Sequence, residues 1–161
     1  SDLVAMDDFI YGEPRARDFH DGDFDGDGFA DPAVFRPSAG TYFVLNTGSN
    51  TFDAVPFGAP GDVPVDGDFD GDKIADVAIY RPAAGEWWIN RSSTGVTVAA
   101  QFGAAGDKPT PRDFDKDGKT DISFWRPSNG NYFVLRSSDN SFFSFPWGQN
   151  GDLPVGSAIA P

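Results

Sequence analysis

The chain has 161 residues and a formal net charge of −13, from 25 acidic and 12 basic side chains. This excess of negative charge argues against nucleic acids and anionic membrane surfaces as partners, because their phosphates would be repelled. No apolar run approaches the roughly 20 residues that span a bilayer, and the lack of cysteine excludes disulfides and thiolate metal sites. The 39% hydrophobic content supports a packed core, and 19 glycines and 13 prolines favour an all-β fold of short strands and turns.

The first predicted element is a strand over residues 5–12, at the end of segment 1–12. It closes on an aromatic residue followed by glycine. The same step recurs three times further along the chain, as Phe57-Gly58, Phe102-Gly103 and Trp147-Gly148. We therefore predict that residues 1–12 form the outer strand of an incomplete structural unit, whose other strands are absent from this end of the sequence.

Three copies of one unit follow, over residues 13–58, 59–103 and 104–148. The Asp-rich loop that begins at Asp23 returns at Asp68 and Asp113, so the period is 68 − 23 = 113 − 68 = 45 residues. An Arg-Pro step, a glycine and an aromatic pair follow each loop at constant distances. They are Arg36-Pro37, Arg81-Pro82 and Arg126-Pro127; Gly40, Gly85 and Gly130; and Tyr42-Phe43, Trp87-Trp88 and Tyr132-Phe133. Self-similarity at such a period is typical of repeat folds.

Each unit is predicted to hold four short strands. In the second copy they cover residues 63–68, 76–81, 86–91 and 96–102, separated by segments rich in Asp, Gly, Pro and Ser that form turns. No stretch shows sustained helical periodicity. Four strands in a period of about 45 residues predict the blade of a β-propeller. A β-sandwich with chance similarity and a linear β-solenoid, whose rungs are usually shorter, are the alternatives.

The last segment, residues 149–161, repeats the start of a unit and predicts an inner strand over residues 153–159. The whole chain, residues 1–161, is thus predicted to be one all-β repeat domain of three four-stranded blades with a spare strand at each end. Propellers close with about 4–8 blades, so three blades need a second copy of the chain or a longer parent chain. Because exposed strand edges pair with other chains, we expect self-association, as a ring-closing dimer or a head-to-tail array.

Each unit carries acidic residues at loop positions 1, 3, 5 and 9. They are Asp23, Asp25, Asp27 and Asp31; Asp68, Asp70, Asp72 and Asp76; and Asp113, Asp115, Asp117 and Asp121. Alternate carboxylates on a tight turn converge on one point, as Ca²⁺ requires, because it takes about 6–8 oxygen ligands at about 2.3–2.6 Å. Position 7 is predicted to add a backbone carbonyl, from Phe29, Ile74 and Lys119. The loops lack the Glu at position 12 of an EF-hand, and all-oxygen ligands disfavour zinc and copper.

Position 6 of the loops holds glycine in two copies, Gly28 and Gly118, and lysine in the second, Lys73. If this position has a positive φ, a residue other than glycine costs about 1 kcal/mol, so the second site is expected to bind more weakly. The alternative interpretation is that the Asp residues form ordinary Asx turns. Three loops in register favour a cation, because clustered carboxylates would otherwise repel one another. We predict two to three calcium ions per chain.

Residues from Tyr11 to Pro154 resemble the FG-GAP/VCBS repeats of bacterial secreted proteins and the blades of integrin α-chain propellers. The Asp loop, the Arg-Pro step and the aromatic-glycine step followed by Gly-Asp carry this resemblance. It implies a propeller whose calcium loops join the first and second strands of blades, outside the cytoplasm. The sequence departs from the pattern at Lys73, by one inserted residue between Tyr11 and Asp23, and by the missing Asp loop near Ala158.

Residues suited to catalysis are few. His20 is the only histidine, and a solvated loop residue is a better interpretation of it than a general base. No Gly-x-Ser-x-Gly elbow or glycine-rich phosphate loop is present, and the paired carboxylates that could serve a glycosidase are assigned to calcium. We predict that the protein is not an enzyme.

Two further sets of repeated residues have both a structural and a binding interpretation. The tryptophans either fill the space between blades, which we favour, or form platforms for sugar rings; they are Trp87, Trp88, Trp125 and Trp147. The repeated arginines, Arg36, Arg81 and Arg126, are expected to pair with nearby acids rather than bind a ligand. The repeated acids Asp62, Asp107 and Asp152 are expected to form turns.

The function predicted from the sequence is an extracellular or cell-surface, calcium-stabilised binding or adhesion module without catalytic activity. Glycans and extracellular proteins are the candidate ligands; nucleic acid binding and membrane insertion are not expected. The alternative is a self-assembling scaffold, a ring or filament, without a small ligand. A non-catalytic appendage of a polysaccharide-degrading enzyme is a third interpretation.

Overall fold

The computed structural model describes residues 22–155. Over this range the protein is all-β, with three antiparallel sheets and no helix in the described part of the chain. The first sheet contains β1 (Ala33–Arg36), β2 (Thr41–Asn46) and β3 (Thr51–Pro56). The second contains β4 (Val63–Gly67), β5 (Asp76–Arg81), β6 (Glu86–Asn90) and β7 (Thr97–Gln101), and the third β8 (Lys108–Pro109), β9 (Ile122–Arg126), β10 (Asn131–Leu135) and β11 (Phe142–Pro146).

The strands of each sheet follow one another in chain order, and each pairs antiparallel with the next. The strands predicted for the second unit are confirmed, because every observed end lies within one residue of the predicted end. The first sheet has three strands within residues 22–155. The spare strand predicted over residues 5–12, and any strand before residue 22, lie outside the described residues.

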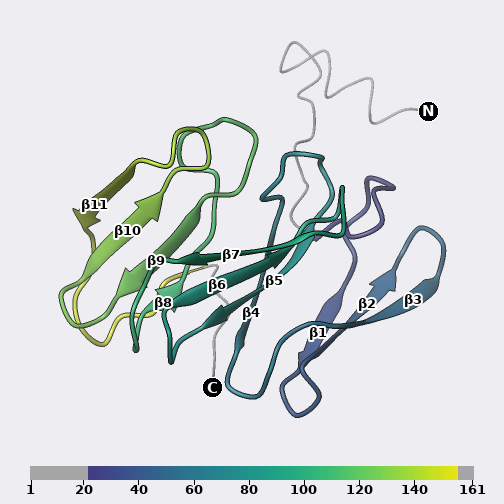
Figure 1. The fold of residues 1–161 in the computed structure, drawn as a ribbon, viewed down its shortest axis with the longest axis horizontal. Coiled ribbons are helices and arrows are strands. Elements are labelled where there is room, and N and C mark those ends of the chain that lie inside the picture. Colours follow the sequence, from purple (N-terminus) through teal and green to yellow (C-terminus); the bar gives the residue numbers. More distant parts are fainter. Residues whose placement is uncertain (1–21, 156–161) are drawn as a thin grey trace, which may run out of the picture.

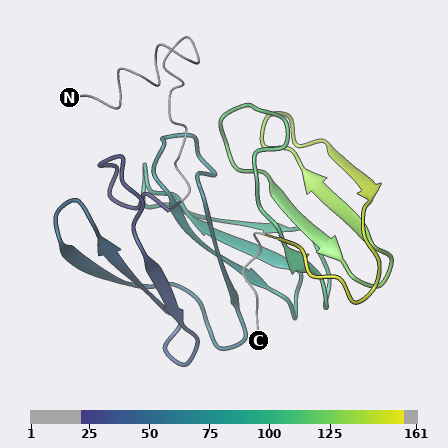
Figure 2. The same cartoon turned by 180° about the vertical axis from the view of Figure 1, so that it is seen from behind.

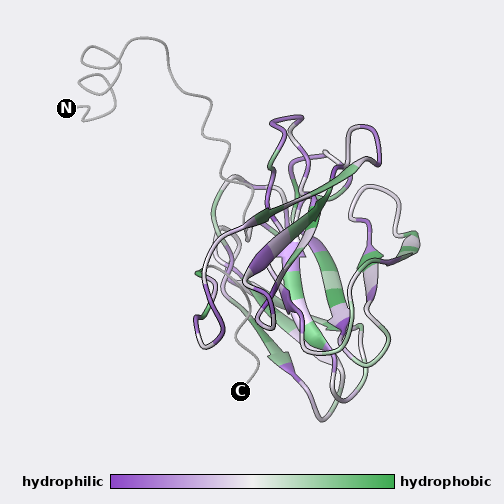
Figure 3. Cartoon of the chain, turned by 90° about the vertical axis from the view of Figure 1, so that its left-hand side faces the viewer, coloured by the Kyte–Doolittle hydropathy of each residue, from purple (hydrophilic) through white to green (hydrophobic). Residues whose placement is uncertain are grey.

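The second sheet lies between the other two, as both views of the ribbon show (Figure 1 and Figure 2). This position explains the burial of β5, in which five consecutive residues are buried and so face neighbours on both sides. One apolar cluster, with Tyr42, Val77 and Ile79, joins the first and second sheets. Another, with Tyr80 and Trp87 among its members, joins the second and third. In Figure 3 the hydrophobic residues follow the strands, whereas many of the connecting loops are hydrophilic.

Polar contacts also hold the first sheet to the second. The Tyr42 hydroxyl donates to the carbonyl of Ala78, and the amide of Val65 donates to the Tyr42 hydroxyl at 3.0 Å. A buried hydroxyl without such partners would destabilise the fold by about 1–3 kcal/mol. Directional hydrogen bonds, as well as apolar packing, therefore determine how the first two sheets contact each other.

Two of the three repeated arginines, and the repeated turn acids, behave as the sequence indicates. Arg81 forms two hydrogen bonds of 2.9 Å with Asp62, and Arg126 forms two of 2.8 Å with Asp107. Asp62 and Asp107 also accept the backbone amide three residues before them, which closes a turn, and Asp152 does the same. Each complete pair therefore ties the turn before the first strand of a sheet to the end of its second strand. Arg36 instead lies 4.3 Å from the centre of the Phe43 ring.

The predicted inner strand over residues 153–159 is described only in part. Residues 153–155 are not in a strand, and residues 156–161 lie outside the described part of the chain. The division into blades with an added strand at each end therefore stays a prediction.

Candidate metal centre

The three Asp loops precede β1, join β4 to β5 and join β8 to β9. Consecutive loops contact one another through the backbone. The amide of Ala75 in the second loop donates to the carbonyl of Asp23 in the first at 2.6 Å, and Thr120 in the third donates to Asp68 in the second at the same distance. The loops therefore form a connected row across the three sheets, and each one contributes to the joint between neighbouring sheets.

Positions 4 and 6 of every loop have a left-handed backbone. At position 6, φ is 88° for Gly28, 73° for Lys73 and 86° for Gly118, so the positive φ predicted there is confirmed. Position 4 shares it, with Gly26 and Gly71 in two loops and Lys116, at φ 62°, in the third. The sequence analysis missed position 4, because lysine in the third copy hides a glycine preference that the first two copies show.

These left-handed residues direct backbone amides onto the carboxylate at position 1. In each loop the amides of positions 4 and 6 donate to the two oxygens of that carboxylate. The bonds run from Gly26 and Gly28 to Asp23 (2.8 and 2.9 Å), from Gly71 and Lys73 to Asp68 (2.6 and 2.8 Å), and from Lys116 and Gly118 to Asp113 (2.6 and 3.1 Å). The loop conformation thus fixes its first carboxylate before any ion is considered.

The carboxylate at position 9 is buried in all three loops and holds the loop to the sheet. One of its oxygens accepts the amide of the phenylalanine at position 2, and the other accepts the amide of a residue one or two places after β2, β6 or β10. The pairs are Phe24 and Thr47 on Asp31, Phe69 and Ser92 on Asp76, and Phe114 and Ser137 on Asp121. This residue therefore has a structural role in addition to the predicted role as a ligand.

Three carboxylates in each loop come close enough to share one ion. The groups are Asp23, Asp25 and Asp27; Asp68, Asp70 and Asp76; and Asp113, Asp115 and Asp121, each with one oxygen per residue within 4.8 Å of the others. Two ligands of one Ca²⁺ lie at most about 4.6–5.2 Å apart, twice the calcium–oxygen distance. The separation and the all-oxygen ligand set therefore fit a hard divalent cation.

The other predicted ligands have different contacts. Asp72 and Asp117, at position 5, accept hydroxyl hydrogen bonds from Ser92 (2.9 Å) and Ser137 (2.8 Å). At position 7, the amides of Phe29, Ile74 and Lys119 donate to the position 5 carboxylate of their own loop. The carbonyls of these three residues stay predicted ligands.

Electrostatics in the loops reflects the crowding of acids. The pKa of Asp25 is raised, first by desolvation and then by the carboxylates of Asp27, Asp31 and Asp23. Desolvation also acts to raise the pKa of Asp70, but hydrogen bonds from Ser93 and from the amide of Asp72 outweigh it and lower that pKa. A cation at the centre of the first loop would relieve the repulsion that Asp25 experiences.

Two serines after the third strand are loop residues that the sequence analysis missed. Ser93 donates to Asp70 at 2.6 Å, and Ser138 donates to Asp115 at 2.5 Å, 45 residues later. The first unit has Gly48 at this place, where an added Cβ would lie 1.6 Å from a carboxylate oxygen of Asp27. The recurrence of Ser-Ser at the repeat period was the available signal.

The tryptophans divide into two groups. Trp87 and Trp125 are buried, and their indole nitrogens donate to the carbonyls of Phe102 (2.8 Å) and Trp147 (3.0 Å), so the space-filling interpretation is confirmed for them. Trp88 is half-buried, whereas Trp147 is 73% exposed. His20 lies outside the described residues.

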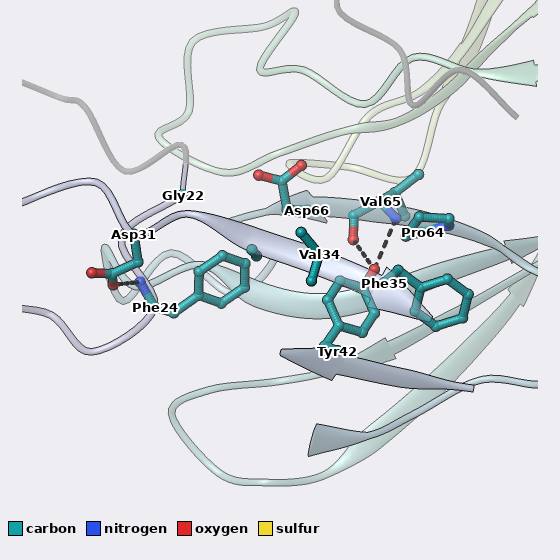
Figure 4. Close-up of a pocket in the computed structure, with 10 residues that line it drawn as sticks. Gly22, Phe24, Asp31, Val34, Phe35, Tyr42, Pro64, Val65 and Asp66 are labelled. Atoms are coloured by element: carbon teal, nitrogen blue, oxygen red, sulfur yellow. Dashed lines mark hydrogen bonds between the residues drawn. The ribbon is translucent and has the colours of Figure 1, made fainter. Parts of the chain in front are cut away.

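A small cavity of about 230 Å³ lies between the first sheet and β4 (Figure 4). Its walls combine apolar side chains, including Phe24, Phe35 and Pro64, with a similar amount of polar surface. The Tyr42 hydroxyl at its edge is already bonded to the backbone of the second sheet. Asp31, which also lines the cavity, uses its two carboxylate oxygens in the loop contacts described above. These polar groups therefore serve the fold.

Comparison with known proteins supports the repeat. No curated protein matches the chain. In the structure, no helix in the described part is long and apolar enough to cross a membrane. A protein-family model, the FG-GAP-like repeat, matches residues 68–122. The match begins at the first acidic residue of the second loop, Asp68, includes the whole third loop and ends at the first residue of β9. The resemblance to FG-GAP repeats suggested by the sequence is thus confirmed over residues 68–122, where the chain contains an FG-GAP-like repeat.

Proposed function

We propose that the protein is a calcium-stabilised β-propeller module that acts outside the cell or at its surface, binds a partner and catalyses no reaction. The observation that carries this proposal is that each of the three loops holds a cluster of three carboxylates, from positions 1, 3 and 5 in the first loop and from positions 1, 3 and 9 in the other two. The FG-GAP-like repeat over residues 68–122 supports it, because such repeats are often calcium-binding and extracellular. Two four-stranded antiparallel sheets, in which chain order equals strand order, support the propeller blade.

Calcium would be held by the carboxylates at positions 1, 3, 5 and 9 and by the carbonyl at position 7. A bound ion would neutralise the clustered acids and fix the loop that joins the first two strands of a sheet. Because each loop is bonded to the next, the ion would also stabilise the joint between neighbouring sheets. Extracellular modules bind calcium with a Kd of about 10⁻⁴–10⁻³ M, far above resting cytosolic levels, which is why we place the protein outside the cytoplasm.

Chelation is the direct test of the calcium proposal. A ligand that binds only the native state stabilises it by RT ln(1 + [L]/Kd), so excess chelator should lower the Tm measured by calorimetry. Asp25→Ala or Asp115→Ala should each remove one ion from the stoichiometry measured by calorimetric titration and leave the other loops active, since each loop supplies its own ligands. Asp139→Asn, which removes a carboxylate outside the loops, is the control. An unchanged melting curve in chelator would contradict the proposal.

Self-association is a second candidate function, and the exposure of Val34 on β1 favours it. Val34 is 65% exposed, whereas the residues one and two repeats later, Ile79 and Phe124, are 1% and 2% exposed. Those two lie where neighbouring sheets pack together. Phe52, on the same sheet as Val34, is 73% exposed. We propose that another copy of the chain covers this surface, in a closed dimer or a head-to-tail array.

A glycan or an extracellular protein is the proposed external ligand. Trp147 and Phe142 are exposed aromatic residues of the third unit, at 73% and 69%, and exposed aromatic rings can stack on sugars. A glycan array probed with the calcium-loaded chain tests this part of the proposal. Loss of a positive signal in Trp147→Ala would assign it to that residue, and a signal unaffected by the substitution would exclude Trp147.

A further inference from the structure

A cavity of about 480 Å³ lies between the second and third Asp loops. Three basic residues line it, Lys73 from the second loop and Arg112 and Lys119 from the segment that leads into and through the third. The protein as a whole carries a net charge of −13. Three carboxylates, Asp68, Asp113 and Asp117, line the same cavity, so the cations balance the acids there instead of being outnumbered as they are in the protein as a whole.

These cations break the symmetry of the repeat. The equivalent residues 45 positions earlier, between the first and second loops, are Gly28, Gly67 and Ile74, none of which is charged. The backbone joint is nevertheless the same, since Ala75 bonds to Asp23 as Thr120 bonds to Asp68. The side chain at position 7 also packs alike, with Ile74 against Gly26 and Lys119 against Gly71. The fold of the joint therefore does not require the cations.

Among residues 22–155, none of the three cations forms a salt bridge with a carboxylate. The salt bridges between described residues join Arg81 to Asp62 and Arg126 to Asp107. Within residues 22–155 the Arg112 guanidinium donates one hydrogen bond, to the carbonyl of Val155 at 3.2 Å, so most of its five donors have no partner in that range.

The acids of the same cavity are already engaged by their own loops. Each accepts short hydrogen bonds from loop amides, and Asp117 also accepts one from Ser137. The bonds come from Gly71 and Lys73 to Asp68, from Lys116 and Gly118 to Asp113, and from Lys119 to Asp117. The oxygens of these carboxylates are thus hydrogen-bonded within their own loops, whereas the three cations make no ion pair with them.

Lys73 adds a further observation. Its φ of 73° is unfavourable for any residue with a Cβ, and glycine fills the same position in the other two loops. Lys116 has a similar φ of 62° without lining the cavity, so it is the position of Lys73, and not its strain, that bears on a role in the cavity. Its exposed side chain is one of the three that line the cavity.

We propose that this cavity binds an oxyanion group, a sulfate or a carboxylate, carried by an acidic saccharide. The planar guanidinium of Arg112 matches such groups with paired hydrogen bonds, and the lysines add compact charge. The volume lies within the usual range for small-ligand sites, about 300–1,000 Å³. The oxyanion site stands on the three cations and does not depend on calcium; only the saccharide as carrier rests on the extracellular binding function proposed above.

The test is an NMR titration of the calcium-loaded chain with four probes: inorganic sulfate, a sulfated heparin hexasaccharide, a carboxylated hyaluronan hexasaccharide and neutral maltohexaose. We expect the amides of Lys73, Arg112 and Lys119 to shift with at least one acidic probe and not with maltohexaose. A response to the sulfated or the carboxylated saccharide identifies the group. Binding of inorganic sulfate alone would keep the oxyanion site and overturn the saccharide. No shift with any acidic probe would overturn the proposal.

Two triple variants separate a specific site from general charge. Lys73→Gly/Arg112→Gln/Lys119→Ile removes the three cations from the cavity. Two of these changes introduce the residues found 45 positions earlier, Gly28 and Ile74, in the contact between the first and second loops. Arg91→Gln/Lys108→Gln/Lys116→Gly removes the same charge elsewhere. The first should weaken binding at least about tenfold, as loss of charge-assisted hydrogen bonds implies, and the second less than about twofold. Equal weakening would overturn the proposal. If the first variant does not fold, Arg112→Gln alone, an exposed change, replaces it under the same criterion.

Independent calcium measurements keep the two proposals distinguishable. A chain that binds calcium and no acidic probe would retain the calcium proposal and overturn the oxyanion site. A chain that binds the acidic probes with unchanged affinity in chelator would retain the oxyanion site whatever the loops do.

Discussion

Two lysines of the Asp loops, Lys73 and Lys116, occupy left-handed positions where the other copies hold glycine. An L-residue in this conformation costs about 1 kcal/mol or more through the contact of its Cβ with the backbone. The two lysines differ in surroundings, since Lys73 lines the cavity between the second and third loops and Lys116 does not line it. Because both lysines have a left-handed backbone and only Lys73 lines the cavity, Lys116→Gly serves as the control for Lys73→Gly.

Lys73→Gly should raise the free energy of unfolding by about 1 kcal/mol, measured by chemical denaturation in chelator. In calcium it should also tighten the second site, or leave it unchanged, because a positive charge beside the acids is lost. Lys116→Gly should stabilise by a similar amount. A Lys73→Gly variant that loses calcium would contradict the left-handed turn on which the second loop is built.

The acid at position 9 provides a second prediction at the residue scale. Asp76→Ala removes the acceptor of the amides of Phe69 and Ser92, both bonded at 2.7 Å. Leaving two amides unsatisfied should cost roughly 3 kcal/mol of unfolding free energy, even in chelator. Asp72→Ala, which removes a less buried acid of the same loop, should cost less than about 1 kcal/mol under the same conditions. Equal losses would show that position 9 is not a structural anchor.

At the scale of the sheets, the hydroxyl of Tyr42 joins β2 to the second sheet. Tyr42→Phe should lower the free energy of unfolding by about 1–2 kcal/mol, because the amide of Val65 and the carbonyl of Ala78 lose a buried partner. The matched control is Tyr132→Phe, two repeats later, whose hydroxyl makes no hydrogen bond within residues 22–155. That variant should change stability by less than about 0.5 kcal/mol. Denaturant titration of both variants provides the comparison.

The strands were predictable because local signals agree. Alternating apolar residues and turn-forming segments placed the ends of β4–β7 within one residue, and the 45-residue period placed the Asp loops in the other copies. Contacts between elements were not predictable in the same way. The bond from Ser93 to Asp70 depends on how the segment after β6 folds back onto the loop. The burial of Trp87 likewise depends on residues of the adjoining sheet, such as Ile122. The sequence of the second unit alone does not contain those residues.

For the whole molecule, the exposed apolar side chains of the first sheet lead to a prediction about assembly. The chain should self-associate at micromolar concentration in calcium, because Val34 and Phe52 would otherwise face water. Light scattering measures the mass. Val34→Asp should shift the population towards monomer, whereas Leu153→Asp, an equally exposed change in the segment after β11, should have less effect. A compact, stable, calcium-loaded wild-type monomer would contradict this prediction.

The same backbone hydrogen bond joins each Asp loop to the next, so the three sheets form a linear array in which neighbours are connected by similar contacts. In such an array, stability is a sum of intrinsic terms and nearest-neighbour terms, as in a one-dimensional Ising chain. Only the middle sheet has a neighbour on each side, and β5 is buried almost throughout. Opening should therefore proceed from the outer units inward, with the amide hydrogens of β5 the last to exchange with solvent. A cation bound in one loop would then slow the opening of its neighbour as well as its own.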